Sequence, residues 1–248
     1  MFRFLFNRRG RWMEEGLTKD QADILRSLPE LAGLKEPAFQ KICGLSRVLM
    51  EEKTFEGCSG LTLTERMKLI VSGYAALMLA GDVSDYFPGL QSILIYPKPY
   101  IAPVEDYDEA GIVTSGHERR FGESWEFGSL VLAWNEIERH IRTASRDNLV
   151  IHEFAHQIDD ELGISLEVER VLNGNADTPW AAIIARKFET FSRNPGRLPS
   201  VDTYGAEDLH EFFAVLSELF FTYPQHLRSD SKALFDVMCT CYNQKPIP

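Results

Sequence analysis

The chain has 248 residues, of which 37 are acidic and 26 basic, and its formal net charge is −11. This length suffices for one large domain or for a domain with a smaller lobe, and a hydrophobic content of 44% is typical of a folded globular chain rather than a disordered one. The acidic balance argues against direct binding to nucleic acid, because phosphate backbones are bound by clustered lysine and arginine.

The cysteines and the apolar runs bear on the location of the chain. Four cysteines at this length do not make a disulfide scaffold, so we expect reduced thiols. The basic, aromatic residues 1–12 contain too short an apolar run for a secretory signal, and we expect a frayed tail or an arm packed on the body. The longest other run, residues 69–80, is too short to cross a bilayer. We therefore expect no transmembrane segment and a cytoplasmic location.

The N-terminal part of the chain is predicted to be helical. Thr18 and Gln21 have the spacing of a capping box and are predicted to open one helix. Pro37 suits the first position of a second helix. Thr62 and Glu65 have the spacing of another capping box, and a strongly apolar helix is predicted to follow them.

Short strands are predicted in the middle of the chain. Ser92–Tyr96, residues 111–114 and residues 129–134 are rich in β-branched or apolar residues and are predicted as strands. Residues 97–108 are rich in proline and acidic residues and are predicted as a loop. Residues 115–128 contain three glycines, which favour a hairpin or an edge strand.

From about residue 140 the pattern is helical again. Asp147 is predicted to cap a helix over Leu149–Leu162, and Gly163 is a natural end for it. Further helices are predicted over residues 178–191, 206–221 and 231–242.

Residues 152–156 read His-Glu-Phe-Ala-His, which is the pattern HExxH in the middle of a predicted helix. Histidines four residues apart lie on one helix face, so His152 and His156 can both reach a single zinc ion. Glu153 lies about 100° around the helix from His152, which suits a general base beside a water molecule better than a ligand. The surrounding apolar residues indicate a buried helix, and a pair of structural core histidines is the alternative.

A catalytic zinc ion usually has three protein ligands and one open position. Residues 158–165 contain no third histidine, so we expect a carboxylate from further along the chain. Glu207, Glu211 and Glu218 accompany the apolar segment 206–221, where a carboxylate is costly unless it is paired or bound to metal. The residue pattern alone does not choose among the three.

Two segments together resemble a known family. They are residues 150–159, which read VIHEFAHQID, and residues 204–221, which read YGAEDLHEFFAVLSELFF. Both resemble the Mlc titration factor A family of bacterial zinc metallopeptidases, whose catalytic core is similar to that of anthrax lethal factor. Weaker matches extend the resemblance over about residues 55–242, namely at 94–97, 124–125 and 128–134.

The resemblance implies roles for two further residues. Glu211 would be the third metal ligand, and Tyr204 would donate its hydroxyl to the oxyanion that forms on the substrate carbonyl. The alternative for Tyr204 is a loop tyrosine that caps the next helix. Asp159 is a candidate hydrogen-bond partner for a ligand histidine, whereas His210 is expected to be non-catalytic. Gln157 departs from the family, which often has a basic residue at this position.

We therefore expect an α+β fold of the zincin kind, mostly helical with a short mixed sheet. A helical region over residues 1–90 would precede a zincin-like catalytic region over residues 91–248, the two forming one compact unit. Zinc would be the cofactor and a peptide or protein the substrate. The resemblance implies aminopeptidase-like activity on small substrates and binding of an Mlc-like, glucose-responsive transcriptional repressor.

Two other functions are alternatives to this prediction. In the first, the chain acts mainly as a regulatory protein that sequesters the repressor, and its peptidase activity is weak or conditional. A purely structural zinc site is disfavoured, because such sites usually close with four protein ligands that are mostly cysteine.

Overall fold

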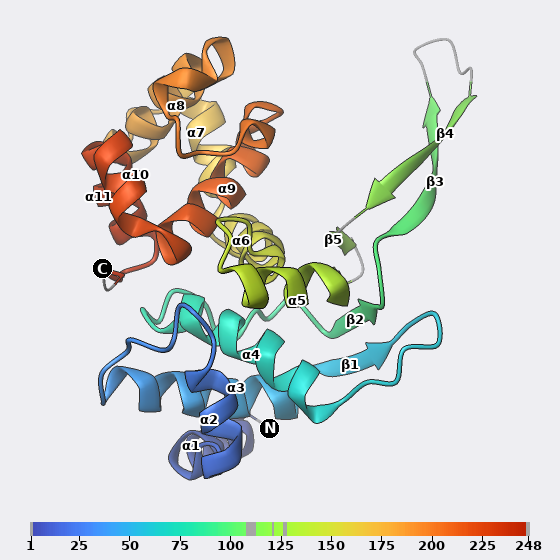
Figure 1. The fold of residues 1–248 in the computed structure, drawn as a ribbon. Coiled ribbons are helices and arrows are strands. Elements are labelled where there is room, and N and C mark those ends of the chain that lie inside the picture. The colour runs from blue at the N-terminus through green and yellow to red at the C-terminus, as the bar shows by residue number, and fades with distance from the viewer. Residues whose placement is uncertain (1, 108–112, 121, 126–127, 247–248) are drawn as a thin grey trace.

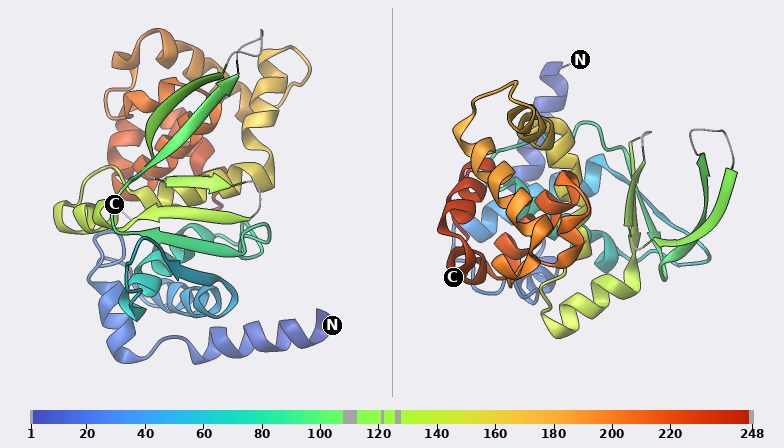
Figure 2. Two further views of the ribbon diagram at one scale, coloured as in Figure 1. Left: turned by 90° about the vertical axis from the view of Figure 1, so that its right-hand side faces the viewer. Right: turned by 90° about the horizontal axis from the view of Figure 1, so that it is seen from above.

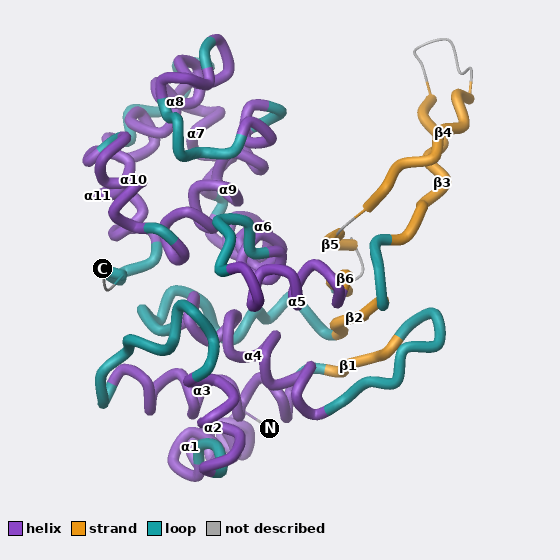
Figure 3. Tube along the Cα trace, viewed as in Figure 1, coloured by secondary structure: helices purple, strands orange, loops and turns teal. Residues whose placement is uncertain are grey.

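The computed structural model of the chain describes residues 2–107, 113–120, 122–125 and 128–246. Figure 1 shows the N-terminal helices at one end of the molecule and the later helices at the other, with α6 between them. The strands gather on one side of this helical body, as the colouring of Figure 3 makes plain. The prediction of a mostly helical α+β fold is confirmed.

The N-terminal helices are α1 Phe2–Glu15, α2 Lys19–Arg26, α3 Ala38–Glu52 and α4 Glu65–Leu79. The capping box before α2 is confirmed, because the Thr18 hydroxyl accepts from the Gln21 amide and the Gln21 side chain accepts from the Thr18 amide. The prediction that Thr62 opens α4 is wrong. Thr64 is the cap instead, and its hydroxyl accepts from the backbone N–H of Met67 at 3.2 Å. A cap must lie directly before the first helical residue, and the helix begins at Glu65.

The N-terminal arm is packed on the body rather than frayed. Helix α1 lies against α3, and the indole of Trp12 is buried. The guanidinium of Arg9 contacts Glu52 and Asp85, each at 2.6 Å. These contacts tie α1 to the end of α3 and to the loop that follows α4.

The main sheet has four strands in the order β1-β2-β6-β5. They are β1 Thr54–Gly57, β2 Ser92–Tyr96, β5 Gly122–Trp125 and β6 Ser129–Ala133. The first three strands of this order are parallel and β5 is antiparallel to β6, so the predicted short mixed sheet is confirmed. Strand β1 was not predicted. Strand β6 is one residue shorter than predicted, because Trp134 begins the next helix.

A separate hairpin projects from the body, as Figures 1 and 2 show. Its strands are β3 Tyr100–Tyr107 and β4 Val113–Arg120, and they pair antiparallel with each other. The predicted loop over residues 97–108 is therefore wrong where β3 runs. Proline is tolerated in a strand that has one unpaired edge, and β3 pairs with β4 alone among the described strands. Of the strand predicted over 111–114, residues 111 and 112 lie outside the described part of the chain.

Helices form the rest of the chain. They are α5 Trp134–Thr143, α6 Leu149–Leu162, α7 Ile164–Leu172, α8 Pro179–Arg193, α9 Leu209–Thr222, α10 Pro224–Asp230 and α11 Lys232–Cys241, with 3₁₀ turns over Pro195–Arg197 and Thr203–Ala206. Helix α6 has the predicted bounds and ends at Gly163, which has a φ of +62°. Its cap is Asn148, not the predicted Asp147. Helix α9 begins three residues later than predicted, because Asp208 caps it.

One core joins the N-terminal helices to the later ones. Helices α6 and α9 pack side by side, and α4 packs against α6 from the N-terminal side. Buried apolar residues of all three helices belong to one continuous core. The division of the chain at residue 90 stays a prediction. Within the described residues, no helix is both long and apolar enough to span a membrane.

Candidate metal centre

Helix α6 brings the two histidines of the HExxH pattern together. Asn148 begins the helix by accepting the Ile151 N–H on its side-chain oxygen at 3.2 Å. His152 and His156 then lie one turn apart, and their Nε2 atoms are 3.2 Å from each other. Both side chains are mostly buried, so the two nitrogens face a shared, partly desolvated point.

Glu211 reaches this point from α9. One carboxylate oxygen lies 3.1 Å from Nε2 of His152, and the other lies 3.7 Å from Nε2 of His156. Its place in the first turn of α9 follows from the cap, because Asp208 accepts the Glu211 N–H at 2.8 Å. His152, His156 and Glu211 each offer a ligand atom, and these atoms lie within 4.8 Å of one another.

The three donors fit a tetrahedral metal ion. Ligand atoms bound to tetrahedral zinc at 2.0–2.1 Å lie about 3.3 Å apart, and the two Nε2 atoms, at 3.2 Å, match that value. The nearest oxygens of Glu211, one to each histidine, lie at 3.1 and 3.7 Å. Oε2 of Glu211 is buried yet makes no well-formed hydrogen bond within the described structure. Two imidazoles and one carboxylate also leave a fourth position open, which is the donor set of a catalytic rather than a structural site.

The other two candidate carboxylates lie elsewhere. Glu207 is exposed and precedes α9. Glu218 is buried two turns after Glu211, with Oε1 at 2.8 Å from Nδ1 of His152 and Oε2 accepting the backbone N–H of Asn148. An ionised carboxylate can only accept hydrogen bonds, so Glu218 favours the tautomer of His152 with hydrogen on Nδ1. That tautomer leaves Nε2 of His152 free to face the point shared with His156.

The sequence prediction missed this role of Glu218 and expected Asp159 to hold a ligand histidine. Asp159 is buried, but it accepts instead from the amide and hydroxyl of Ser165, at 2.7 and 2.5 Å. It also lies 2.8 Å from Nδ1 of His210. One feature of the sequence points to this role, namely a lone carboxylate within the apolar helix α9. Burying such a carboxylate is costly unless it has a hydrogen-bond partner, so Glu218 requires one.

The electrostatics of the metal-free site separate the two histidines. Burial lowers the pKa of His152, but the neighbouring carboxylates of Glu211 and Glu218 outweigh burial and raise that pKa well above its ordinary value. Burial and the neighbouring His152 lower the pKa of His156 to about 4. The ring of His156 is therefore already neutral and able to bind a metal ion. The ring of His152 holds a proton that a metal ion must displace.

Glu153 and Tyr204 are the other two site residues that the sequence predicts. Glu153 is 5% exposed, and burial, opposed by His152, raises the pKa of its carboxyl to about 7. Tyr204 is 46% exposed, and its ring centroid is 6.1 Å from that of His152. Its hydroxyl lies near the Glu211 carboxylate, and burial and that charge raise the pKa of the hydroxyl above its ordinary value. Tyr204 is not the cap of α9, since Asp208 is.

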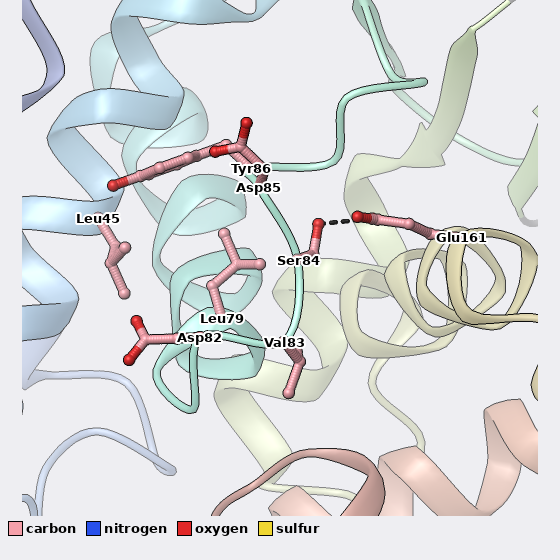
Figure 4. A pocket seen from close by; sticks show the side chains of 8 residues that line it. All are labelled: Leu45, Leu79, Asp82, Val83, Ser84, Asp85, Tyr86 and Glu161. Atoms are coloured by element: carbon pink, nitrogen blue, oxygen red, sulfur yellow. Dashed lines mark hydrogen bonds between the residues drawn. The ribbon is translucent and has the colours of Figure 1, made fainter. Parts of the chain in front are cut away.

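A pocket of about 380 Å³ lies away from the cluster, between α3, α4, the loop after α4 and the end of α6. Figure 4 shows its lining, in which the Ser84 hydroxyl donates to Glu161 at 2.6 Å. Asp82 and Asp85 carry much of its charge, but Lys41 and Arg9 pair with them. None of the five predicted site residues lines it, namely His152, Glu153, His156, Tyr204 and Glu211.

Comparison with known proteins agrees with the geometry. The model of the family described as glucose-regulated metallo-peptidase M90 matches residues 5–243. Proteins named Mlc titration factor A from Yersinia pestis (strain Pestoides F) and Yersinia pseudotuberculosis serotype O:1b (strain IP 31758) are each 31% identical to the chain over 239 residues. These alignments cover 92% of this chain and 88% of each relative. Membership of a metallopeptidase family implies a bound metal ion. The chain therefore belongs to the M90 family of glucose-regulated metallo-peptidases.

Proposed function

We propose that the chain is a zinc-dependent peptidase in which His152, His156 and Glu211 hold the metal. The observation that carries the proposal is the convergence of two Nε2 atoms and one carboxylate within 4.8 Å. A buried carboxylate oxygen of Glu211 without a well-formed hydrogen bond supports it, because a metal ion would satisfy that oxygen.

The residues around these donors suit peptide hydrolysis. Zinc bound here would polarise the scissile carbonyl and acidify a water molecule. Glu153 takes the proton of the attacking water and later delivers it to the leaving amine, a role that suits a carboxyl whose pKa is about 7. Tyr204 donates its hydroxyl to the oxyanion that develops on the carbonyl oxygen. Its raised pKa keeps that hydroxyl protonated at neutral pH.

The edge of the main sheet supports binding of an extended peptide. Strand β5 pairs with β6 on one side, and on its other side it has no partner among the described strands. Helix α6 lies against β5, so the free edge and the metal centre are close in space. A peptide added to this edge would be held by backbone hydrogen bonds. We propose short peptides as substrates, with aminopeptidase-like cleavage as the family resemblance implies.

Metal content and turnover of short peptide arylamides, measured on wild type and Glu153→Gln, test this function. We expect about one zinc ion per chain in both proteins, with turnover in wild type alone. The substitution keeps the size of the side chain but removes the group that accepts the proton. Full activity of Glu153→Gln would refute the mechanism.

A second function is favoured by the names of the relatives. Proteins called Mlc titration factor A are named for a partner, Mlc. We propose that this chain binds an Mlc-like repressor of glucose-uptake genes in the cytoplasm, where its four free cysteines would stay reduced. Pulldown of the repressor by His152→Ala would show that binding does not need the metal centre. Zinc in wild type without any turnover would favour this regulatory function over peptidase activity.

A further inference from the structure

A buried polar cluster lies where the N-terminal helices meet the start of α6. It consists of Glu30, which follows α2, Tyr74 of α4, His140 of α5 and Asn148, the cap of α6. The side chain of Glu30 is 5% exposed, and the other three residues are at most 1% exposed. None of these four residues has a role in the proposed hydrolysis.

Each of the four side chains lies beside at least one other. Nε2 of His140 lies 2.9 Å from a carboxylate oxygen of Glu30. The rings of Tyr74 and His140 meet edge to face, with centroids 5.7 Å apart. Burial and the charge of Glu30 raise the pKa of the Tyr74 hydroxyl, whereas Asn148 lowers it, so both groups lie within reach of that hydroxyl.

Each member of the cluster has a polar atom that needs a partner. Oε2 of Glu30, the hydroxyl of Tyr74, Nδ1 of His140 and Nδ2 of Asn148 are all buried, and none makes a well-formed hydrogen bond to another described residue. Buried polar atoms are nearly always satisfied in folded proteins, and ordered water is the usual partner where side chains do not meet directly. The cluster has the polar lining that an internal water molecule requires.

Asn148 links this cluster to the metal centre. Its side-chain oxygen holds the first turn of α6, while its backbone N–H donates to Oε2 of Glu218. The other oxygen of Glu218 lies 2.8 Å from Nδ1 of His152. A series of polar contacts therefore runs from Asn148 through Glu218 to His152, and the Tyr74 hydroxyl lies within reach of the Asn148 side chain at its start.

We propose that Glu30, Tyr74, His140 and Asn148, bridged by ordered water, are positioning residues for the metal centre. They orient the Asn148 cap, which holds Glu218, and Glu218 in turn fixes the ring of His152. The inference rests on the proposed function, because it takes His152 as a zinc ligand. It assigns the N-terminal helices a part in zinc binding, since Glu30 and Tyr74 both belong to that region.

A pair of matched substitutions tests the proposal. Tyr74→Phe removes one buried hydroxyl from the cluster. Tyr242→Phe removes another buried hydroxyl, which donates to Ser217 at 2.8 Å in the core beside α11 and lies outside the cluster. We would measure zinc affinity of the full chain by competition with a chromophoric chelator. In the metal-free proteins we would record the ring-nitrogen NMR signals of His152, assigned with His152→Asn.

We expect Tyr74→Phe to weaken zinc binding about 3- to 10-fold, somewhat less than the loss typical for a direct partner of a ligand histidine. Its His152 signals should shift away from those of wild type, because the contact of Nδ1 with Glu218 is held less firmly. Tyr242→Phe should bind zinc within twofold of wild type and leave those signals unchanged, although both variants lose stability. Equal zinc affinity and equal His152 signals in Tyr74→Phe and wild type would overturn the proposal.

The two proposals fail in different ways. A wild-type chain that binds no zinc would refute the proposed function, and the His152 signals of the metal-free Tyr74→Phe protein would then decide the inference alone.

Where Tyr74→Phe does not fold, Glu30→Gln takes its place, because it keeps the shape of the buried carboxylate. Its control is Glu36→Gln, which alters an exposed carboxylate paired with Arg26. We expect weaker zinc binding in the first and no change in the second.

Discussion

Replacement of Glu218 by glutamine should weaken zinc binding even though the two side chains have the same shape. In the native chain both carboxylate oxygens accept a hydrogen bond, one from Nδ1 of His152 and one from the backbone N–H of Asn148. Glutamine offers one acceptor and one donor. Whichever way its amide is turned, an NH₂ group faces either the Asn148 N–H, which then loses its acceptor, or Nδ1 of His152, which must then accept and leave the hydrogen on Nε2.

The size of the effect follows from the role of the contact. Loss of a group that orients a metal-binding histidine typically costs about 10- to 100-fold in metal affinity. That factor corresponds to ~1.4–2.8 kcal/mol of binding free energy. The upper part of the range is expected here, because Glu218 is buried and its negative charge also favours the tautomer that presents Nε2.

Chelator competition on the full chain measures this change, with Glu207→Gln as the matched control. Glu207 is a glutamate of the same segment that is exposed and precedes α9, so its variant should bind zinc like wild type. Zinc affinity of Glu218→Gln within twofold of wild type would refute the reasoning. Loss of zinc from Glu207→Gln but not from Glu218→Gln would show that the wrong carboxylate was chosen.

Three further outcomes are expected. Tyr204→Phe should keep its zinc and its KM but lose about 10²- to 10³-fold in kcat, because it removes one oxyanion donor; unchanged kcat in steady-state assays would contradict this role. The metal-free protein should lose thermal stability as pH rises from about 6 to 8. The folded-state pKa values of His152 and Glu153 are both raised, so these two groups hold more protons in the folded chain in that window and outweigh the lowered pKa of His156, and saturating zinc should flatten the profile in calorimetry. Phe154→Ala should cost about 3–5 kcal/mol of unfolding free energy in urea titrations, because Phe154 is 1% exposed and packs on Phe87.

Local sequence determined the helix that carries the histidines. The bounds of α6 were predicted correctly, because apolar periodicity and a glycine end are properties of neighbouring residues. The placement of His152 and His156 on one face follows from helical geometry alone. The family resemblance supplied Glu211 and Tyr204, whose positions in the sequence are not set by any local rule.

Only the tertiary structure decided which polar residue caps α6 and which carboxylate holds His152. Asp147 and Asn148 are both good cap residues. Asp159 and Glu218 are both carboxylates that lie near the site in sequence or in space. Asn148 caps α6, and its backbone N–H meets Glu218, which lies 70 residues later in the chain. Such a contact depends on how α6 and α9 pack, and the packing energy is a property of the whole core. The cluster around Tyr74 cannot be predicted from the sequence for the same reason, because four separate segments of the chain must fold together before its members meet.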